Sequence, residues 1–237
     1  MIDIHTHILP NVDDGAEDIN QAIELLNQAI EQGITHVILT PHIILNSSRF
    51  PGVETIKQRF LEFQEQVKDL DIKIYLGSEI FYSSKAYQRL VNDELITFNN
   101  SKYCLIEFTM KKKQDIDEAL YNIRAKGYYP ILAHPERYEY IKLEDVVKIK
   151  EHSKIQVNTS SILGLHGRKI RRFAFKMMKN NLVDYVASDS HNPTTRYINL
   201  LEAYKIVSKK FGKAHADNVF TVNQEKLISK IIDKESQ

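Results

Sequence analysis

Short apolar runs alternate with longer amphipathic segments along most of the chain. The apolar runs have the length of buried strands and occupy residues 2–5, 36–40, 73–76, 103–108, 129–133, 154–158 and 184–187. The amphipathic segment 18–32 repeats Ile23, Leu26 and Ile30 at helical spacing, and Gly33 is a typical residue after a helix end. This alternation predicts a series of βα units.

The other amphipathic segments predict further helices. They occupy residues 53–70, 85–92, 115–126, 143–152, 169–180, 196–211 and 224–233. These strands and helices fit a single α/β barrel, in which we expect the last helix to cover one end. An open doubly wound sheet would produce the same alternation. No linker divides the chain, so we expect one domain over residues 1–237.

Composition narrows the class of protein. The 237 residues are 43% hydrophobic and 27% charged, which is typical of globular proteins. A net charge of +1 does not indicate nucleic-acid binding. The single cysteine, Cys104, cannot form an internal disulfide, so we expect a reducing cytoplasm. We also expect no secretory signal and no membrane insertion, because no apolar run approaches about 20 residues.

Side chains that can bind metals follow most of the predicted strands. A parallel strand in a barrel is buried on both faces, so polar side chains are expected where it emerges at its carboxyl end. At these points the sequence places His5, His7, His42, Glu79, Glu107, His134, Asp189 and His191. This placement favours the barrel over the open sheet.

The spacing of these residues favours metal binding over ordinary packing. His5 and His7 are two residues apart on a strand, so both side chains share a face and can bind one cation. Asp189 and His191 repeat this spacing. A buried array of imidazoles and carboxylates without a metal would carry a large desolvation cost. The remaining histidines pair with no candidate ligand and are interpreted as ordinary residues: His36, His152, His166 and His215.

The candidate ligands also indicate a type of chemistry. They are too many for one ion and suit a cluster of two or three. Manganese, iron and zinc all accept imidazole and carboxylate ligands. Metal ions roughly 3.5–4 Å apart activate water and bind both the attacking and the leaving oxygen of a phosphoryl transfer. The sequence therefore predicts a metal-dependent phosphoester hydrolase.

Six motifs, in order along the chain, resemble the PHP (polymerase and histidinol phosphatase) superfamily. They are residues 4–10 (IHTHILP) with 13–15 (DDG), 40–42 (TPH), 77–79 (GSE), 106–108 (IEF), 134–137 (HPER) and 188–192 (SDSHN). Within this superfamily the chain is similar to the bacterial protein-tyrosine phosphatases of capsule and exopolysaccharide operons. The resemblance covers most of the chain and implies a distorted (β/α)7 barrel.

The resemblance implies roles for individual residues. It implies three metal ions, with manganese expected and iron or zinc as alternatives. His5, His7, Glu79 and Asp189 would bind the first ion; Glu79, Glu107 and His134 the second; Asp14, His42 and His191 the third. Arg137 and Arg196 match the arginines that bind the phosphate. Two departures from the family pattern, Ile43 and Thr109, remove no ligand and fall in loops expected to face the substrate.

The predicted activity is hydrolysis of phosphotyrosine by a metal-activated hydroxide, without a covalent phospho-enzyme. The resemblance implies a tyrosine kinase of bacterial polysaccharide synthesis as the phosphorylated partner. The main alternative is a small-molecule phosphatase, such as one for histidinol phosphate. A nuclease or phosphodiesterase and a non-catalytic phosphotyrosine-binding scaffold are further alternatives. Cys104 lies in an apolar run without a glycine-rich loop, so we interpret it as buried packing and not as a nucleophile.

Overall fold

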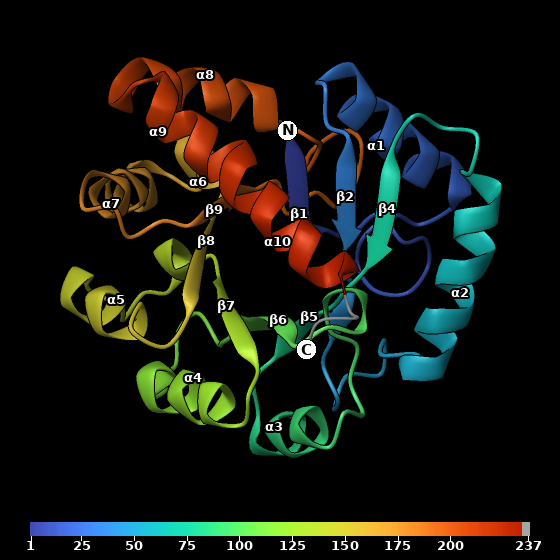
Figure 1. Cartoon of the computed structure of the whole chain (residues 1–237), viewed down its shortest axis with the longest axis horizontal. Helices are drawn as coiled ribbons and strands as arrows, with labels where there is room; N and C mark the ends of the chain where they lie inside the picture. The colour runs from blue at the N-terminus through green and yellow to red at the C-terminus, as the bar shows by residue number, and fades with distance from the viewer. Residues whose placement is uncertain (234–237) are drawn as a thin grey trace.

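Parallel strands form the centre of the computed structural model, which describes residues 1–233 (Figure 1). One sheet has the order β1-β2-β4, and the other has the order β3-β5-β6-β7-β8-β9. The strands are β1 (Ile2–Thr6), β2 (His36–Leu39), β3 (His42–Ile43), β4 (Lys73–Leu76), β5 (Glu79–Phe81), β6 (Tyr103–Glu107), β7 (Tyr129–Ala133), β8 (Lys154–Asn158) and β9 (Tyr185–Ala187). All the pairings between them are parallel.

The two sheets join into one barrel. β3 follows directly on β2, and β5 follows directly on β4, so each pair is one barrel strand with an interruption. A parallel bridge between Thr6 and Ser190 connects the end of β1 to the segment after β9. Next to this bridge, the His7 N–H donates to the Ser190 carbonyl over 2.8 Å. The strands therefore form a closed ring, which confirms the predicted distorted α/β barrel. An open sheet would lack this contact between the first and last strands.

Local sequence explains both interruptions. Pro41 lacks the N–H group that a continuing strand would donate to its neighbour. Gly77 lies where a Cβ atom would be 2.7 Å from Cδ1 of Phe98, so a larger residue could not pass this close to the ring. The strand segments that follow begin with candidate ligands, His42 in β3 and Glu79 in β5.

Helices surround the barrel at the places that the sequence predicts. They are α1 (Ile19–Glu31), α2 (Val53–Gln66), α3 (Ser84–Val91), α4 (Ile116–Ala125), α5 (Leu143–Ile149), α6 (Thr159–Leu163), α7 (Arg168–Lys179), α8 (Leu200–Phe211), α9 (Lys213–Asp217) and α10 (Asn223–Ile232). The short helices α6 and α9 were not predicted. In the described part of the chain, none of the helices combines the length and the apolar character that a bilayer-spanning helix requires.

One predicted helix, 196–211, begins too early. The structure starts α8 at Leu200, because the preceding residues form a turn around the side chain of Asn192. Asn192 Oδ1 accepts hydrogen bonds from the backbone N–H groups of Thr195 at 2.7 Å and Arg196 at 3.2 Å. Such side-chain bonds to the backbone compete with helix formation. Arg196 therefore lies in a loop and not in the first turn of a helix.

Two apolar clusters stabilise the fold. The larger one packs the surrounding helices against the outer faces of the strands. The smaller one fills the barrel, where Ile4 and Leu105 meet Leu227 and Ile231 of α10. In Figure 1, α10 crosses in front of the strands. This confirms that the last helix covers one end of the barrel, and the carboxyl ends of the strands are left to the polar residues.

We expect Gly77→Ala to destabilise the fold, because its Cβ would lie 2.7 Å from the Phe98 ring and 2.9 Å from Cγ2 of Ile38. Overpacking of this kind costs about 1–3 kcal/mol of unfolding free energy. Urea unfolding followed by circular dichroism measures the loss. Combining it with Phe98→Leu should recover part of the loss, since residues in contact are non-additive. Purely additive losses would contradict the close approach of Gly77 and Phe98.

Candidate metal centre

The nine predicted ligands gather at the carboxyl ends of the strands. They are His5 in β1, His7 and Asp14 in the loop after it, His42 in β3, Glu79 in β5, Glu107 in β6, His134 after β7, and Asp189 and His191 after β9. The Asp14 side chain is 44% exposed, and the other eight are at most 18% exposed. Six strands, β1, β3, β5, β6, β7 and β9, therefore contribute to one polar mouth of the barrel.

Four of these side chains converge at the centre of the mouth. His5 Nε2 and His7 Nε2 are 3.2 Å apart. Asp189 Oδ1 lies 3.6 Å and 3.4 Å from these two nitrogens, and Glu79 Oε2 lies 3.3 Å and 3.4 Å from them. Two atoms bound at about 2.1 Å to one tetrahedral ion are themselves roughly 3.4 Å apart. The four donors thus have the spacing of one coordination sphere and form the first predicted set.

Glu79 connects this group with two others. Its Oε1 atom is 2.9 Å from Nε2 of His134, and the same nitrogen is 3.6 Å from Oε1 of Glu107. The Oε2 atom of Glu79 is 3.0 Å from Nδ1 of His42. The second predicted set is therefore also assembled. Glu79 stands where the resemblance requires a carboxylate shared by two ions.

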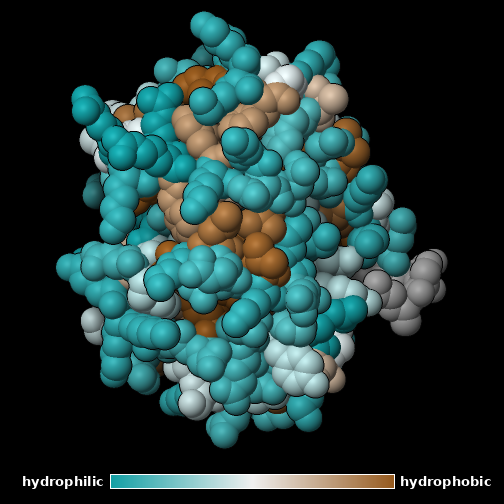
Figure 2. All heavy atoms as spheres, turned by 90° about the vertical axis from the view of Figure 1, so that its left-hand side faces the viewer, coloured by the Kyte–Doolittle hydropathy of each residue, from teal (hydrophilic) through white to brown (hydrophobic). Residues whose placement is uncertain are grey.

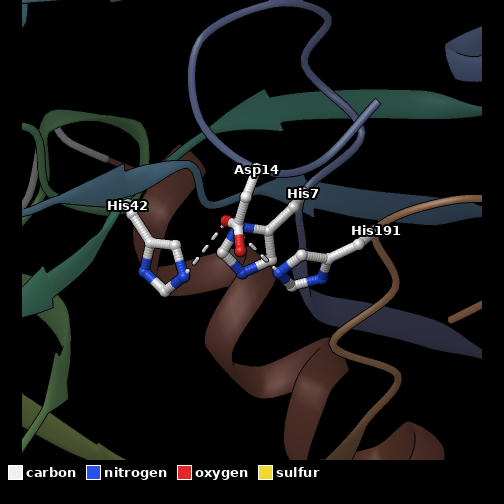
Figure 3. A group of neighbouring side chains, drawn as sticks. All are labelled: His7, Asp14, His42 and His191. Carbon is white, nitrogen blue, oxygen red and sulfur yellow. Dashed lines mark ion pairs between the residues drawn. The ribbon is translucent and has the colours of Figure 1, made fainter. Parts of the chain in front are cut away.

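The third predicted set lies at the outer edge of the mouth, beside His7 (Figure 3). Asp14 Oδ1 is 3.6 Å from Nε2 of His42 and 3.6 Å from Nε2 of His191. The rings of His7 and His191 pack with their centroids 3.9 Å apart. Asp14 comes from the loop before α1, so strand periodicity alone could not have identified it.

Buried ligand atoms without hydrogen-bond partners indicate that the site fits metal ions. Among the described residues, Glu79 Oε2 and His191 Nε2 are buried and accept or donate no hydrogen bond. An unsatisfied buried polar group costs about 1–3 kcal/mol, so such atoms are rare. Divalent transition metals accept the lone pairs of imidazole and carboxylate groups. A set of donors with this chemistry fits the implied ions.

Two side chains behind the ligands determine which histidine nitrogen faces the centre. His7 donates from Nδ1 to Asp13 Oδ2 over 2.7 Å, and His5 donates from Nδ1 to Gln156 Oε1 over 3.0 Å. Each bond leaves Nε2 with a free lone pair for a metal. Asp13 also accepts from the backbone N–H of His42 at 2.9 Å. Asp13 thus links two of the predicted sets.

Sequence reasoning missed the contribution of β8. Gln156 Nε2 donates to Asn158 Oδ1 over 2.7 Å, and Asn158 Nδ2 donates to Asp189 Oδ2 over 2.7 Å. Together with the bond from His5 to Gln156, these contacts connect two members of the first set. Both residues are fully buried. Their signal was two polar residues at alternate positions inside a predicted buried strand.

The two predicted arginines lie beside the ligands and contact Asp189. Arg137 Nη1 donates to Asp189 Oδ2 over 3.2 Å. Arg196 Nη2 is 3.1 Å from each carboxylate oxygen of Asp189. A guanidinium carries five N–H donors, so both side chains retain donors for a phosphate. The contact with Asp189 fixes the two arginines at one edge of the mouth.

Two of the candidate ligands have a left-handed backbone conformation. The angle φ is 32° at His134 and 54° at Asp189. Residues other than glycine rarely adopt this region, which costs about 1–3 kcal/mol. Strain of this kind persists where surrounding contacts enforce it, and it is concentrated at functional sites.

The pKa shifts of side chains in the mouth indicate that this region favours bound positive charge. Burial and the nearby Glu79 carboxylate raise the pKa of Glu107 to about 8. Burial lowers the pKa of His7, but the carboxylates of Asp13, Asp189 and Glu79 together outweigh it and raise that pKa well above its ordinary value. Both shifts favour bound protons on Glu107 and His7. Metal ions that bind here would displace them, as is usual for imidazole ligands.

None of the residues interpreted as ordinary contacts a candidate ligand in the described part of the chain, although His166 lies near enough to Arg137 and Arg196 for their charges to lower its pKa. His36 stacks on Tyr75, and His152 lies 3.7 Å from Asp117. His166 bonds Ser160, and His215 packs against Phe211. Cys104 is fully buried, and burial raises the pKa of its thiol far above the ordinary value. Cys104 is therefore a packing residue, as predicted, and not an activated nucleophile.

Comparison with known proteins identifies the family. A sequence model described as "Capsular polysaccharide synthesis, CpsB/CapC" matches residues 1–229. This chain belongs to the CpsB/CapC family. Its relatives in this family include the tyrosine-protein phosphatase YwqE of Bacillus subtilis, with 32% identity over 96% of this chain and 91% of that protein. The tyrosine-protein phosphatase CpsB of Streptococcus agalactiae serotype V is 33% identical over 96% of this chain and 98% of that protein.

Two solved structures share the fold. One belongs to a set of crystal structures of YwqE from Bacillus subtilis and CpsB from Streptococcus pneumoniae, which are described as "unique metal-dependent tyrosine phosphatases". It matches with a TM-score of 0.83 and 31% identity, covering 91% of this chain and 90% of that one. A histidinol phosphate phosphatase of Lactococcus lactis matches with a TM-score of 0.60 and 13% identity, covering 92% and 94%. The second likeness shows the fold alone.

We expect Asp13→Ala to weaken metal binding about 10- to 100-fold, because His7 would lose the partner that orients its ring. Competition titration with a chromophoric chelator measures the affinity. The matched control is Glu17→Ala in the same loop, whose carboxylate accepts a bond from Gln21 and contacts no candidate ligand. Wild-type affinity in Asp13→Ala would contradict the orienting role.

Proposed function

We propose that this chain is a metal-dependent protein-tyrosine phosphatase formed by one catalytic domain. The observation that carries the proposal is that three clusters of imidazole and carboxylate side chains converge around Glu79. Two arginines lie beside them. Family membership supports it, since relatives bear the name of tyrosine-protein phosphatases. A related solved structure is described as metal-dependent.

The proposed ligand sets follow the three groups of side chains. His5, His7, Glu79 and Asp189 would bind one ion; Glu79, Glu107 and His134 a second; Asp14, His42 and His191 a third. Manganese is the proposed metal, with iron or zinc as alternatives. When bound, the ions supply activated water and neutralise the charge of the phosphate. Asp13 and Gln156 keep His7 and His5 oriented toward them.

Arg137 and Arg196 are the proposed phosphate-binding residues. Each presents a planar set of donors that matches the oxygens of a phosphate and cannot lose its charge. Their shared contact with Asp189 places both on the same side of the ligand groups. The phosphate of the substrate would therefore lie between the arginines and the metal-binding side chains, with the tyrosine directed away from the barrel.

A tyrosine-phosphorylated protein is the proposed substrate. The family description refers to capsular polysaccharide synthesis, so a tyrosine kinase that regulates this synthesis is the proposed partner. We place the reaction in the cytoplasm, where the lone buried thiol of Cys104 would stay reduced.

Comparison of two substrates tests this function. We expect purified protein to hydrolyse a phosphotyrosine peptide faster than histidinol phosphate and to lose both activities when a chelator removes its metals. Restoring manganese should restore turnover. Full activity after complete metal removal would contradict the proposed chemistry. Faster turnover of histidinol phosphate would retain the chemistry and replace the substrate with a small molecule.

Arg137→Lys and Arg196→Lys should each lower kcat/KM about 10- to 100-fold, because a lysine keeps the charge but loses the forked contact, and a charged hydrogen bond contributes about 1.5–3 kcal/mol. Steady-state kinetics on an aryl phosphate measures the effect. Arg89→Lys is a suitable control, since Arg89 on α3 pairs with Glu94 after that helix, away from the ligands. Unchanged kinetics in both site variants would show that these arginines do not bind phosphate.

Cys104→Ser should retain most phosphotyrosine-peptide activity, because the thiol is buried and its pKa is raised by burial. Thiol alkylation of the folded protein should likewise leave turnover unchanged, while a chelator abolishes it. Activity and metal content are measured on the same batch, with circular dichroism as the control for folding. Loss of activity with the fold and the metals intact would point to cysteine chemistry.

A further inference from the structure

A groove of about 840 Å³ lies on the side of the molecule formed by α5 and α7. We call it the α5–α7 groove. Arg137 lines it and also donates to Asp189 in the candidate metal centre. The groove is therefore continuous with the proposed phosphate-binding edge.

Part of the groove is apolar. Ile141, Leu143, Ile170 and Phe173 line it and are only partly buried. Figure 2 faces this side of the molecule and shows apolar side chains at the centre, surrounded by hydrophilic ones. An exposed apolar area with a polar rim is typical of a surface that binds another chain.

The rim of the groove is rich in positive charge. Lys142, Lys169, Arg172 and Lys176 line it and are exposed. Two exposed carboxylates, Glu139 and Glu144, also line it, and the third, Glu136, is buried and accepts a bond from the backbone of Asn158.

Helix α7 supplies most of this charge without any internal compensation. Its sequence contains six basic residues and no acidic one: Arg168, Lys169, Arg171, Arg172, Lys176 and Lys179. Within residues 1–233 none of the six forms an ion pair, whereas lysines elsewhere do, such as Lys150 with Asp184. In a chain of net charge +1, this is a local field that favours an acidic partner.

We propose that the α5–α7 groove binds the polypeptide that flanks the phosphotyrosine and selects acidic residues next to an apolar one. This inference rests on the proposed function. If Arg137 binds the phosphate, the chain that carries the tyrosine has to pass close to the groove that Arg137 lines. The apolar residues can accept an apolar side chain, and the rim can accept carboxylates. A concave surface suits a peptide, whereas a lipid surface would require a protruding or flat one.

Matched peptides test the proposal. Two phosphotyrosine peptides of equal length share one apolar flanking residue. One carries glutamates beside this residue and the other carries lysines. The third substrate, 4-nitrophenyl phosphate, has no flanking polypeptide. We expect wild type to prefer the acidic peptide. Lys169→Glu with Arg172→Glu should raise KM for that peptide roughly tenfold and leave kcat and 4-nitrophenyl phosphate turnover unchanged, since rim charges act on association. High salt should reduce the wild-type preference.

The control reverses the same number of charges at a distant place. Lys226 and Lys230 are exposed on α10, which covers the opposite end of the barrel. Lys226→Glu with Lys230→Glu should leave both the peptide preference and 4-nitrophenyl phosphate turnover at wild-type values. An equal loss in this control would attribute the effect to net charge and overturn the groove proposal.

Other outcomes separate the two proposals. Equal kcat/KM for both peptides, in wild type and in the groove variant, would overturn the groove proposal and leave the phosphatase proposal intact. Failure to hydrolyse any phosphotyrosine peptide, with histidinol phosphate turned over, would overturn both. Sedimentation with phosphatidylserine vesicles tests the alternative that the groove binds a lipid surface. Vesicle binding that the groove variant loses, with unchanged peptide kinetics, would make the groove a lipid-binding surface and contradict peptide selection.

Discussion

The Glu79 carboxylate lies between three histidine-containing groups, with Oε1 2.9 Å from His134 Nε2 and Oε2 3.0 Å from His42 Nδ1. Burying so many carboxylates and imidazoles without counter-charge would be unfavourable, because each loses its hydration. Cations shared among them would offset that cost. Positive charge bound beside Glu79 would therefore stabilise the close approach of these histidines and carboxylates.

The barrel places these groups by closing its first strand against its last. Asp3 Oδ1 accepts from the backbone N–H of Ser188 over 3.1 Å, and the Asp189 N–H donates to the His5 carbonyl over 2.9 Å. These bonds hold the two ends of the sequence together. Helix α10 fills the opposite end with apolar side chains. Apolar packing is thereby separated from the polar mouth, and the strained backbone at Asp189 is enforced by the contacts around it.

Much of this arrangement could be predicted from the sequence, because parallel strands are buried and their carboxyl ends meet. His5, His7 and the other strand-end residues were found by that rule. Asp14 required the family resemblance, since it lies in a loop. Gln156 and Asn158 were missed because their partners, His5 and Asp189, are distant in the sequence. The start of α8 was wrong because the bonds from Asn192 to the backbone compete with helix formation in a way that helical periodicity does not report.

In the proposed site, the side chains around Glu79 bind two or three separate metal ions. Anomalous diffraction from crystals of manganese-loaded protein, recorded on both sides of the manganese absorption edge, tests it directly. We expect two or three separate peaks, one of them between His5, His7 and Asp189 and another between Glu107 and His134, with Glu79 next to both. A single peak remote from Glu79, or no peak in fully active crystals, would contradict it.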